Sequence, residues 1–315
     1  MIHSKFNVTI QIQKCARAQN VKEKIIMKIG TGYAYWGNDW NCDYIQVTNK
    51  VADIGFDILE IGADHLYHMS DEEIEQLKET GRQRTIEFTT NSGPSRENDL
   101  ASPDKAVREH GIAYFVKVMQ NMKKLGSKIL VGAIYSFWPS DFAYTDKAAA
   151  WKDSIEALKV LSKTAEELDI EIALEVLNRN ESYILNDCKE AMEYVEKIGS
   201  GNITILLDTY HMNIEEDDMY EALRKAGKLL GHVHVGENNR KLPGMNNSID
   251  WKKIGKALKD INYEKAVVME PFLLTGGEVG RDIRVWRDLS NGADSEQMDK
   301  YIGDSLKYLK GCFAE

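Results

Sequence analysis

Short apolar runs and longer amphipathic segments alternate eight times along this 315-residue chain. The apolar runs have the length and the β-branched content of buried strands, and the segments between them have helical periodicity. Eight strand–helix units in succession, with no linker between them, predict a closed (β/α)₈ barrel, also called a TIM barrel. We predict strands over residues 26–34, 56–61, 85–90, 128–133, 170–176, 203–208, 230–235 and 266–270.

The predicted helices carry their own start and stop signals. A capping box from Ser70 to Glu73 begins one helix, and Gly55 and Gly126 end two others. An open doubly wound sheet is the alternative fold, but residues 30–33 lack the third glycine of a dinucleotide-binding loop. Besides the helix that begins at residue 70, we predict helices over residues 44–54, 102–125, 147–168, 188–198, 218–226, 249–261 and 295–309.

Residues 1–26 differ from the rest of the chain. They hold five basic residues against one acidic residue, and they show no sustained apolar periodicity. They also lack the continuous apolar core of a secretory signal. We therefore predict an N-terminal extension outside the fold, followed by a single barrel domain over residues 27–315.

Charge and cysteine content narrow the function classes. The net charge of −10 argues against a nucleic-acid partner, because phosphate contacts need clustered Lys and Arg. Apolar runs stay far below membrane-spanning length, so we predict no membrane segment. The cysteines have no C-x-x-C spacing, which favours free thiols in a cytoplasmic protein. They are Cys15, Cys42, Cys188 and Cys312.

Four of the predicted strands carry an ionisable side chain at or next to their ends. These side chains are Glu175, Asp208, His234 and Glu270, separated by 33, 26 and 36 residues, each about one strand–helix unit. Because parallel strands end at one rim of a barrel, the four should converge. Three carboxylates so close would raise one another's pKa, and a divalent cation would relieve the repulsion. This oxygen-rich set favours Mn²⁺, Mg²⁺ or Co²⁺.

Other side chains follow the same strand ends. His211 and Arg240 can donate hydrogen bonds to an anionic oxygen or a hydroxyl, and Glu181 can accept one from a hydroxyl. Trp40 and Trp138 are candidates for an apolar wall against the carbon face of a sugar, although single tryptophans more often belong to the core.

Two further features have simpler interpretations. His232 shares the side-chain direction of His234, and we interpret it as a core histidine packed between strand and helix. Residues 275–281 contain three glycines and are either a phosphate-binding loop or a flexible surface loop. The surface loop is favoured because Glu278 lies within it.

Around these residues the chain resembles the ketose 3-epimerases, the D-tagatose 3-epimerase and D-psicose (D-allulose) 3-epimerase family of xylose-isomerase-like barrels. The resemblance runs from about Met27 to the C-terminus. It is carried by residues 33–36, 174–179, 207–216, 231–240, 269–272 and 285–288. The chain departs from the family pattern at Gly32, Asn180 and Val235, which we expect near the pocket and which bear on the preferred sugar.

The resemblance implies a metal-dependent inversion at C3 of free ketohexoses, without an organic cofactor. Glu175, Asp208, His234 and Glu270 would hold the metal, with Mn²⁺ favoured, and Glu175 and Glu270 would also be the acid/base pair. By the same resemblance, sugar hydroxyls would contact Glu181, His211 and Arg240, and the pocket would be shaped by Trp40 and Trp138. We also expect a homodimer or homotetramer.

Several other functions use a similar barrel. An aldose–ketose isomerase, a dehydratase and a sugar-phosphate epimerase are the nearest alternatives. A DNA-repair endonuclease is disfavoured by the acidic charge. A non-catalytic sugar-binding barrel would not need a second carboxylate base, whereas this chain has both Glu175 and Glu270.

Overall fold

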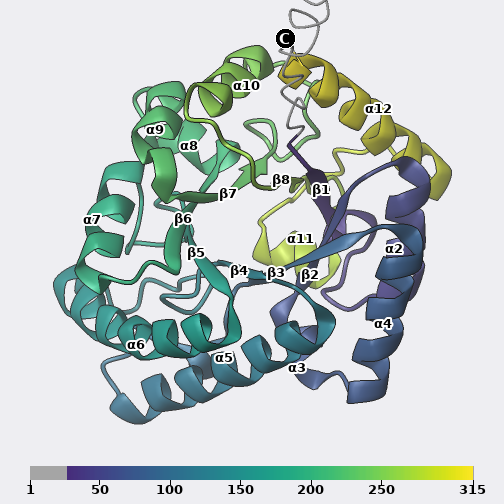
Figure 1. Cartoon of the computed structure of the whole chain (residues 1–315). Helices are drawn as coiled ribbons and strands as arrows, with labels where there is room; N and C mark the ends of the chain where they lie inside the picture. Colours follow the sequence, from purple (N-terminus) through teal and green to yellow (C-terminus); the bar gives the residue numbers. More distant parts are fainter. Residues whose placement is uncertain (1–26, 315) are drawn as a thin grey trace, which may run out of the picture.

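Eight parallel strands form a closed barrel in chain order, and β8 pairs with β1 to complete it. The computed structural model describes residues 27–314, so the predicted extension over residues 1–26 lies outside the described residues. Figure 1 shows the helices as a ring around the strands. The predicted (β/α)₈ barrel is thus confirmed. The strands are β1 (Ile29–Gly32), β2 (Ile58–Gly62), β3 (Glu87–Ser92), β4 (Ile129–Gly132), β5 (Glu171–Val176), β6 (Ile203–Asp208), β7 (Leu230–Val235) and β8 (Val267–Met269).

The longer helices begin and end where the sequence signals predict, within a few residues. Ser70 and Glu73 form the predicted capping box, and the left-handed residues Gly55 and Gly126 end their helices. The final helix continues five residues beyond its predicted end at residue 309. The longer helices are α2 (Tyr44–Ile54), α4 (Asp71–Arg84), α5 (Lys105–Leu125), α6 (Lys147–Leu168), α7 (Cys188–Ile198), α9 (Met219–Ala226), α10 (Trp251–Asp260) and α12 (Ser295–Ala314).

Short helices at the strand ends were not predicted. Helices α3 (Ala63–His68), α8 (Thr209–Glu215) and α11 (Gly277–Asp282) follow β2, β6 and β8, and the 3₁₀ helix η1 (Tyr33–Trp36) follows β1. The expectation of a flexible surface loop over residues 275–281 is therefore wrong. Val279 is buried in α11, and its backbone N–H donates to the Asn38 carbonyl 2.9 Å away.

The barrel interior is divided between an apolar layer and a polar layer. Val131, Ala173 and Leu206 form a small buried cluster that is separate from the main core between strands and helices. Nearer the carboxyl ends of the strands the interior holds buried ionisable side chains instead: Glu60, Glu175, Asp208, His232 and His234. Polar groups removed from water need partners, so this layer marks the functional end of the barrel.

Two expectations from composition can be checked over residues 27–314. None of the helices there is both long enough and apolar enough to cross a membrane. Cys42, Cys188 and Cys312 are free thiols, as predicted. Cys15 lies outside the described residues.

Candidate active site

The four predicted strand-end residues meet at the carboxyl-terminal mouth of the barrel. Glu175, Asp208, His234 and Glu270 each offer one ligand atom, and these atoms all lie within 4.8 Å of one another. Asp208 pairs directly with His234 after a register shift inside β6. Irregularities of this kind re-aim side chains beside active sites. The strands thus bring together side chains that are far apart in the sequence.

Burial and a nearby guanidinium determine the electrostatics of this centre. Desolvation raises the pKa of Glu175, and it raises the pKa of Glu270 to about 8. Arg240 opposes this effect, because its Nη1 lies 3.2 Å from both Asp208 Oδ2 and Glu270 Oε2. The centre therefore combines carboxylates that hold protons unusually well with one permanent positive charge.

His234 presents a ring nitrogen to the carboxylates. Its Nδ1 lies 3.5 Å from Glu175 Oε1 and 3.6 Å from Glu270 Oε2. This buried nitrogen has no hydrogen-bond partner among residues 27–314. Such a group normally has a partner, and one imidazole with three carboxylates is a donor set that suits a hard divalent cation. The residues present therefore fit the predicted Mn²⁺, Co²⁺ or Mg²⁺.

His211 lies beside this centre because Asp208 begins helix α8. The Asp208 side chain accepts a hydrogen bond from the Tyr210 backbone N–H, 3.0 Å away, and the first turn of α8 carries His211 inward. His211 Nδ1 accepts from the Asn178 backbone N–H at 3.1 Å. Burial and the charge of Arg240 lower the pKa of His211 to about 3. The ring is therefore neutral, and its Nε2–H is a donor 3.8 Å from Glu175 Oε1.

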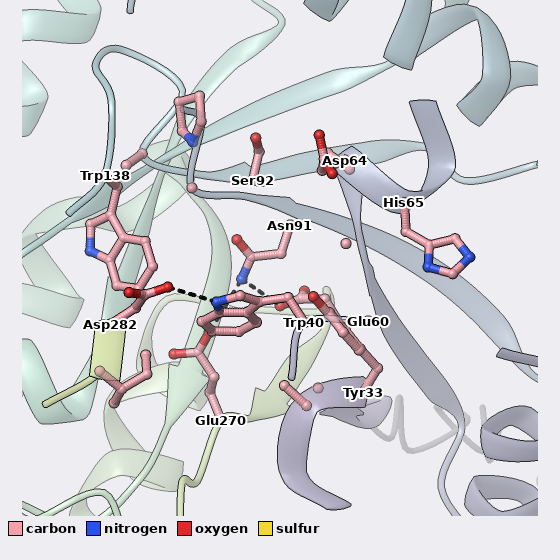
Figure 2. Close-up of a pocket in the computed structure, with 18 of the residues that line it drawn as sticks. Tyr33, Trp40, Glu60, Asp64, His65, Asn91, Ser92, Trp138, Glu270 and Asp282 are labelled. Carbon is pink, nitrogen blue, oxygen red and sulfur yellow. Dashed lines mark hydrogen bonds between the residues drawn. The ribbon is translucent and has the colours of Figure 1, made fainter. Parts of the chain in front are cut away.

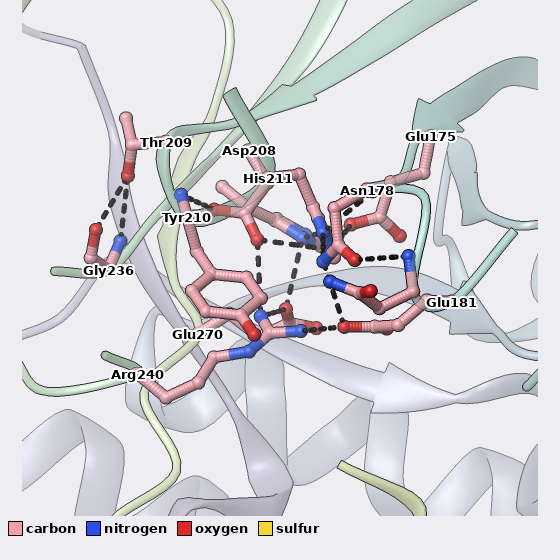
Figure 3. A network of polar contacts seen from close by, with 12 residues as sticks. Glu175, Asn178, Glu181, Asp208, Thr209, Tyr210, His211, Gly236, Arg240 and Glu270 are labelled. Atoms are coloured by element: carbon pink, nitrogen blue, oxygen red, sulfur yellow. Dashed lines mark hydrogen bonds and ion pairs between the residues drawn. The ribbon is translucent and has the colours of Figure 1, made fainter. Parts of the chain in front are cut away.

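Glu181 and Arg240 form a polar side wall (Figure 3). Arg240 Nη2 lies 3.4 Å from Glu181 Oε1, and the Tyr210 ring stacks 3.8 Å from the guanidinium carbon. Asn178 Nδ2 donates to the same Glu181 oxygen at 3.2 Å. A guanidinium fixed by stacking and by carboxylates loses little freedom on binding a hydroxyl or anionic oxygen.

Trp40 and Trp138 form an aromatic wall of the same cavity (Figure 2). Their ring centroids are 6.2 Å apart in an edge-to-face arrangement, and Phe272 packs against Trp40 in the same way. Each indole N–H has a carboxylate acceptor: Trp40 Nε1 donates to Asp282 at 2.9 Å, and Trp138 Nε1 donates to Glu181 at 3.0 Å. The structure therefore places both tryptophans at the cavity, where they are partly buried and pack against the main core.

The cavity has a volume of about 790 Å³ and is lined by residues from both halves of the barrel. Gly32 is one of its lining residues, as expected. Asn180 and Val235, which are expected near the pocket, do not line it. Asn180 is exposed outside the cavity, and Val235 is buried on the outer face of β7 because alternate side chains of a strand point to opposite faces.

His232 is a buried core histidine, but the predicted position between strand and helix is wrong. Two residues before His234, it points into the barrel, where its Nε2 lies 3.1 Å from Glu60 Oε2. Burial raises the pKa of Glu60, yet its contacts with the imidazoles of His234 and His232 hold that pKa well below its usual range. Glu60 is therefore a carboxylate beneath the candidate metal centre.

Sequence analysis missed five side chains of this site. A signal existed for Glu60, which interrupts the apolar strand β2. Asn178 and Tyr210 lie in segments that carry the family resemblance, but no pattern gave a role to either of them, to Asn91 or to Asp282, because these roles depend on contacts between distant segments. The missed residues are Glu60, Asn91, Asn178, Tyr210 and Asp282.

Comparisons with known proteins agree with this geometry. The profile of the family described as xylose isomerase-like TIM barrel matches residues 49–289. The D-psicose 3-epimerase of Ruminiclostridium cellulolyticum is 45% identical over 90% of this chain and 97% of its own. That of Agrobacterium fabrum is 42% identical over 90% of this chain and 98% of its own. A crystal structure of D-psicose 3-epimerase with D-tagatose from Clostridium cellulolyticum has a TM-score of 0.90 and 43% identity, covering 91% of this chain and 99% of the other.

The fold and the matched profile define a xylose isomerase-like barrel. The extent and level of identity to these relatives narrow this further: the chain belongs to the ketose 3-epimerase family. It is accordingly a carbohydrate epimerase, an enzyme of the isomerase class.

Proposed function

We propose that this enzyme inverts C3 of free ketohexoses, interconverting D-fructose with D-psicose and D-tagatose with D-sorbose. The observation that carries the proposal is the pair of carboxylates, Glu175 in β5 and Glu270 directly after β8, which both lie within 3.6 Å of His234 Nδ1. Relatives named D-psicose 3-epimerase support this substrate class.

Glu175, Asp208, His234 and Glu270 would hold the divalent metal, with Mn²⁺ favoured and Co²⁺ or Mg²⁺ as alternatives. When bound, the metal supplies Lewis-acid polarisation of the ketose carbonyl and stabilises the negative charge that develops on its oxygen. The observation that supports a cation here is the unpartnered, buried Nδ1 of His234 among carboxylates.

Glu175 and Glu270 are proposed as the two bases. One removes the C3 proton, and the other returns a proton to the opposite face of the planar intermediate. The burial that raises the pKa of both groups also makes each a stronger base than a solvated carboxylate. Two bases on opposite faces give epimerisation, whereas one mobile base would move a proton between C1 and C2.

The remaining side chains would orient the sugar. Neutral His211 would donate a hydrogen bond to the sugar through Nε2, and Arg240 would donate through its guanidinium N–H groups. Glu181 would accept a hydrogen bond from a sugar hydroxyl. Trp40 and Trp138 present aromatic faces to the carbon skeleton of the sugar, and in doing so they exclude water from the reacting face. We also propose a cytoplasmic homodimer or homotetramer, which size-exclusion chromatography with light scattering tests.

A product assay tests the proposal against its alternatives. The metal-free protein is reloaded with Mn²⁺, Co²⁺, Mg²⁺ or Zn²⁺ and incubated with D-fructose, D-psicose, D-tagatose and D-sorbose, with phosphorylated ketoses in parallel. We expect C3 epimers of the free sugars, no turnover without metal, and better recovery with Mn²⁺ or Co²⁺ than with Zn²⁺. Full activity at a verified metal content of zero contradicts the metal role. Aldose or dehydrated products, or turnover of the phosphorylated sugars alone, favour the alternatives.

A further inference from the structure

Glu60 is a carboxylate enclosed within the barrel, with an exposed fraction of 1%. Thr89 Oγ1 donates to its Oε2 at 2.8 Å, and Asn91 Nδ2 donates to its Oε1 at 3.1 Å. The Nε2 atoms of His232 and His234 lie 3.1 Å from Oε2 and 2.8 Å from Oε1. Each oxygen thus accepts one hydrogen bond and faces one imidazole nitrogen at close range.

One of these contacts leads directly to the candidate metal centre. His234 turns Nε2 to Glu60 and Nδ1 to Glu175 and Glu270. A carboxylate at Nε2 keeps the proton on that nitrogen, so the lone pair is on Nδ1. It also fixes the plane of the ring and increases the basicity of the nitrogen that faces the cation.

A second contact leads to a proposed base. Asn91 Nδ2 lies 3.1 Å from Glu60 Oε1 and 3.3 Å from Glu270 Oε1, so one amide group bridges the two carboxylates. Asn91 lies on β3, and its backbone pairs with Gly62 of β2, so the position of its side-chain amide is fixed by the sheet. Glu60 therefore reaches two members of the centre by two separate routes: it contacts the nitrogen ligand His234 directly, and it reaches the carboxylate of Glu270 through Asn91. Figure 2 shows Glu60, Asn91 and Glu270 together.

We propose that Glu60 is a positioning residue that holds His234 Nδ1 ready for the cation and, through Asn91, holds Glu270 in its working orientation. This inference rests on the proposed metal centre. A buried carboxylate is costly unless it is fully paired, and here two of the groups that pair with it are the groups whose orientation the centre needs. A purely structural role would require that Glu60 be paired, but it would not require that its partners be His234 and Asn91, which reach the centre.

The test measures metal affinity in the metal-free protein, by competition of Mn²⁺ between the protein and a chromogenic chelator. Glu60→Gln keeps the shape but removes the charge and turns an NH₂ group toward a donor. We expect its affinity to fall about 10- to 100-fold. At saturating metal, kcat should fall because the orientation of Glu270 is disturbed. The ketose KM should stay near the wild-type value because the side chains that contact the sugar are unchanged.

Glu171→Gln is the matched control. Glu171 also lies on a barrel strand and accepts from a hydroxyl, Thr204 Oγ1 at 2.6 Å, but it is at the opposite end of β5 from Glu175. We expect this variant to bind Mn²⁺ like the wild type. Thr89→Val removes one donor from Glu60 without touching His234, and a smaller loss of affinity in the same direction is expected.

The outcomes separate this inference from the function on which it rests. Folded Glu60→Gln with an affinity within twofold of wild type overturns it, as does an equal loss in Glu171→Gln. If Glu60→Gln does not fold, unchanged affinity in Thr89→Val overturns it and a selective loss supports it. If the wild-type protein itself binds no Mn²⁺ or makes no epimer, the proposed function fails instead.

Discussion

The two halves of the barrel rim contribute different kinds of side chain. Strands β5 to β8 and the residues that follow them supply the ionisable centre and its polar side wall. The segments after β1 and β4 supply Trp40 and Trp138, which shape the cavity. Glu60 and Asn91 are two polar side chains of the first half that contact the centre.

The interactions that hold the site side chains in place also differ between the two halves. In the second half, polar groups are fixed by other polar groups. Glu237, fully buried at the start of the segment that carries Arg240, accepts from the Gly244 backbone N–H, the Ser248 hydroxyl and the Trp251 indole. In the first half, Trp40 is fixed by edge-to-face packing and one hydrogen bond. Changes at the ionisable centre should therefore reduce kcat, and changes at the aromatic wall formed by Trp40 and Trp138 should alter KM and sugar preference.

The largest loss is expected for the two proposed bases. Glu175→Gln and Glu270→Gln keep the side-chain shape but cannot accept a proton, so epimerisation should fall by about 10²–10⁴-fold or more. Each variant keeps one base, and each should still exchange the C3 hydrogen of one epimer in deuterium oxide, as NMR would show. Metal occupancy is measured in both. Near wild-type turnover in both fully metallated variants contradicts the two-base assignment, and a loss in only one favours a single-base reaction.

A smaller loss is expected from His211, with no change in the shape of the pH profile. His211→Gln removes one imidazole donor and should lower kcat/KM by roughly tenfold, the effect of one hydrogen bond. Because the pKa of His211 is lowered to about 3, the ring gains a proton only near that pH and is neutral from pH 5 to pH 8. Rate profiles of both proteins should therefore run parallel over that range. Loss of an ionisation near pH 6.5 in the variant would show that the ring is charged during turnover.

Trp138→Phe should have a still smaller effect, and on a different parameter. The phenyl ring keeps most of the apolar face but cannot donate to Glu181. We expect KM for the ketose to rise a few-fold while kcat stays within about twofold, in keeping with one lost hydrogen bond. Trp40→Phe, which loses the donation to Asp282, is the matched variant. A fall in kcat as large as that of Glu270→Gln would erase the distinction between the two halves.

Removing residues 1–26 should have the smallest effect. These residues lack periodic apolar positions, and the closed barrel is formed by residues 27–314. Truncation should leave kcat, KM and the thermal midpoint nearly unchanged. A midpoint lowered by many degrees would show that the extension packs on the barrel or on a second subunit.

The fold and the centre of the site followed from the sequence because both depend on local patterns. Strand periodicity and strand-end residues such as Asp208 and His234 are visible in one segment at a time. The short helices α3, α8 and α11 were missed because helices of one or two turns have little periodicity and depend on tertiary contacts. Asn178 and Asp282 were missed because their partners lie 33 and 242 residues away along the chain.

The barrel seam has a consequence for synthesis of the protein. Residues near the start of the barrel have their hydrogen-bond partners near its end: Trp40 donates to Asp282, and Trp36 donates to Asp299. The Asn38 carbonyl accepts from α11, where Gly277 lies so close to it that a larger side chain would not fit. At about 5–20 residues per second, the 242 residues from Trp40 to Asp282 take roughly 10–50 s to translate. A nascent chain that ends just after Glu270 therefore contains the four strand-end residues but lacks Asp282, the hydrogen-bond partner of Trp40. The hydrogen bond that fixes Trp40 in the aromatic wall can therefore form only after all four ionisable residues of the centre have been synthesised.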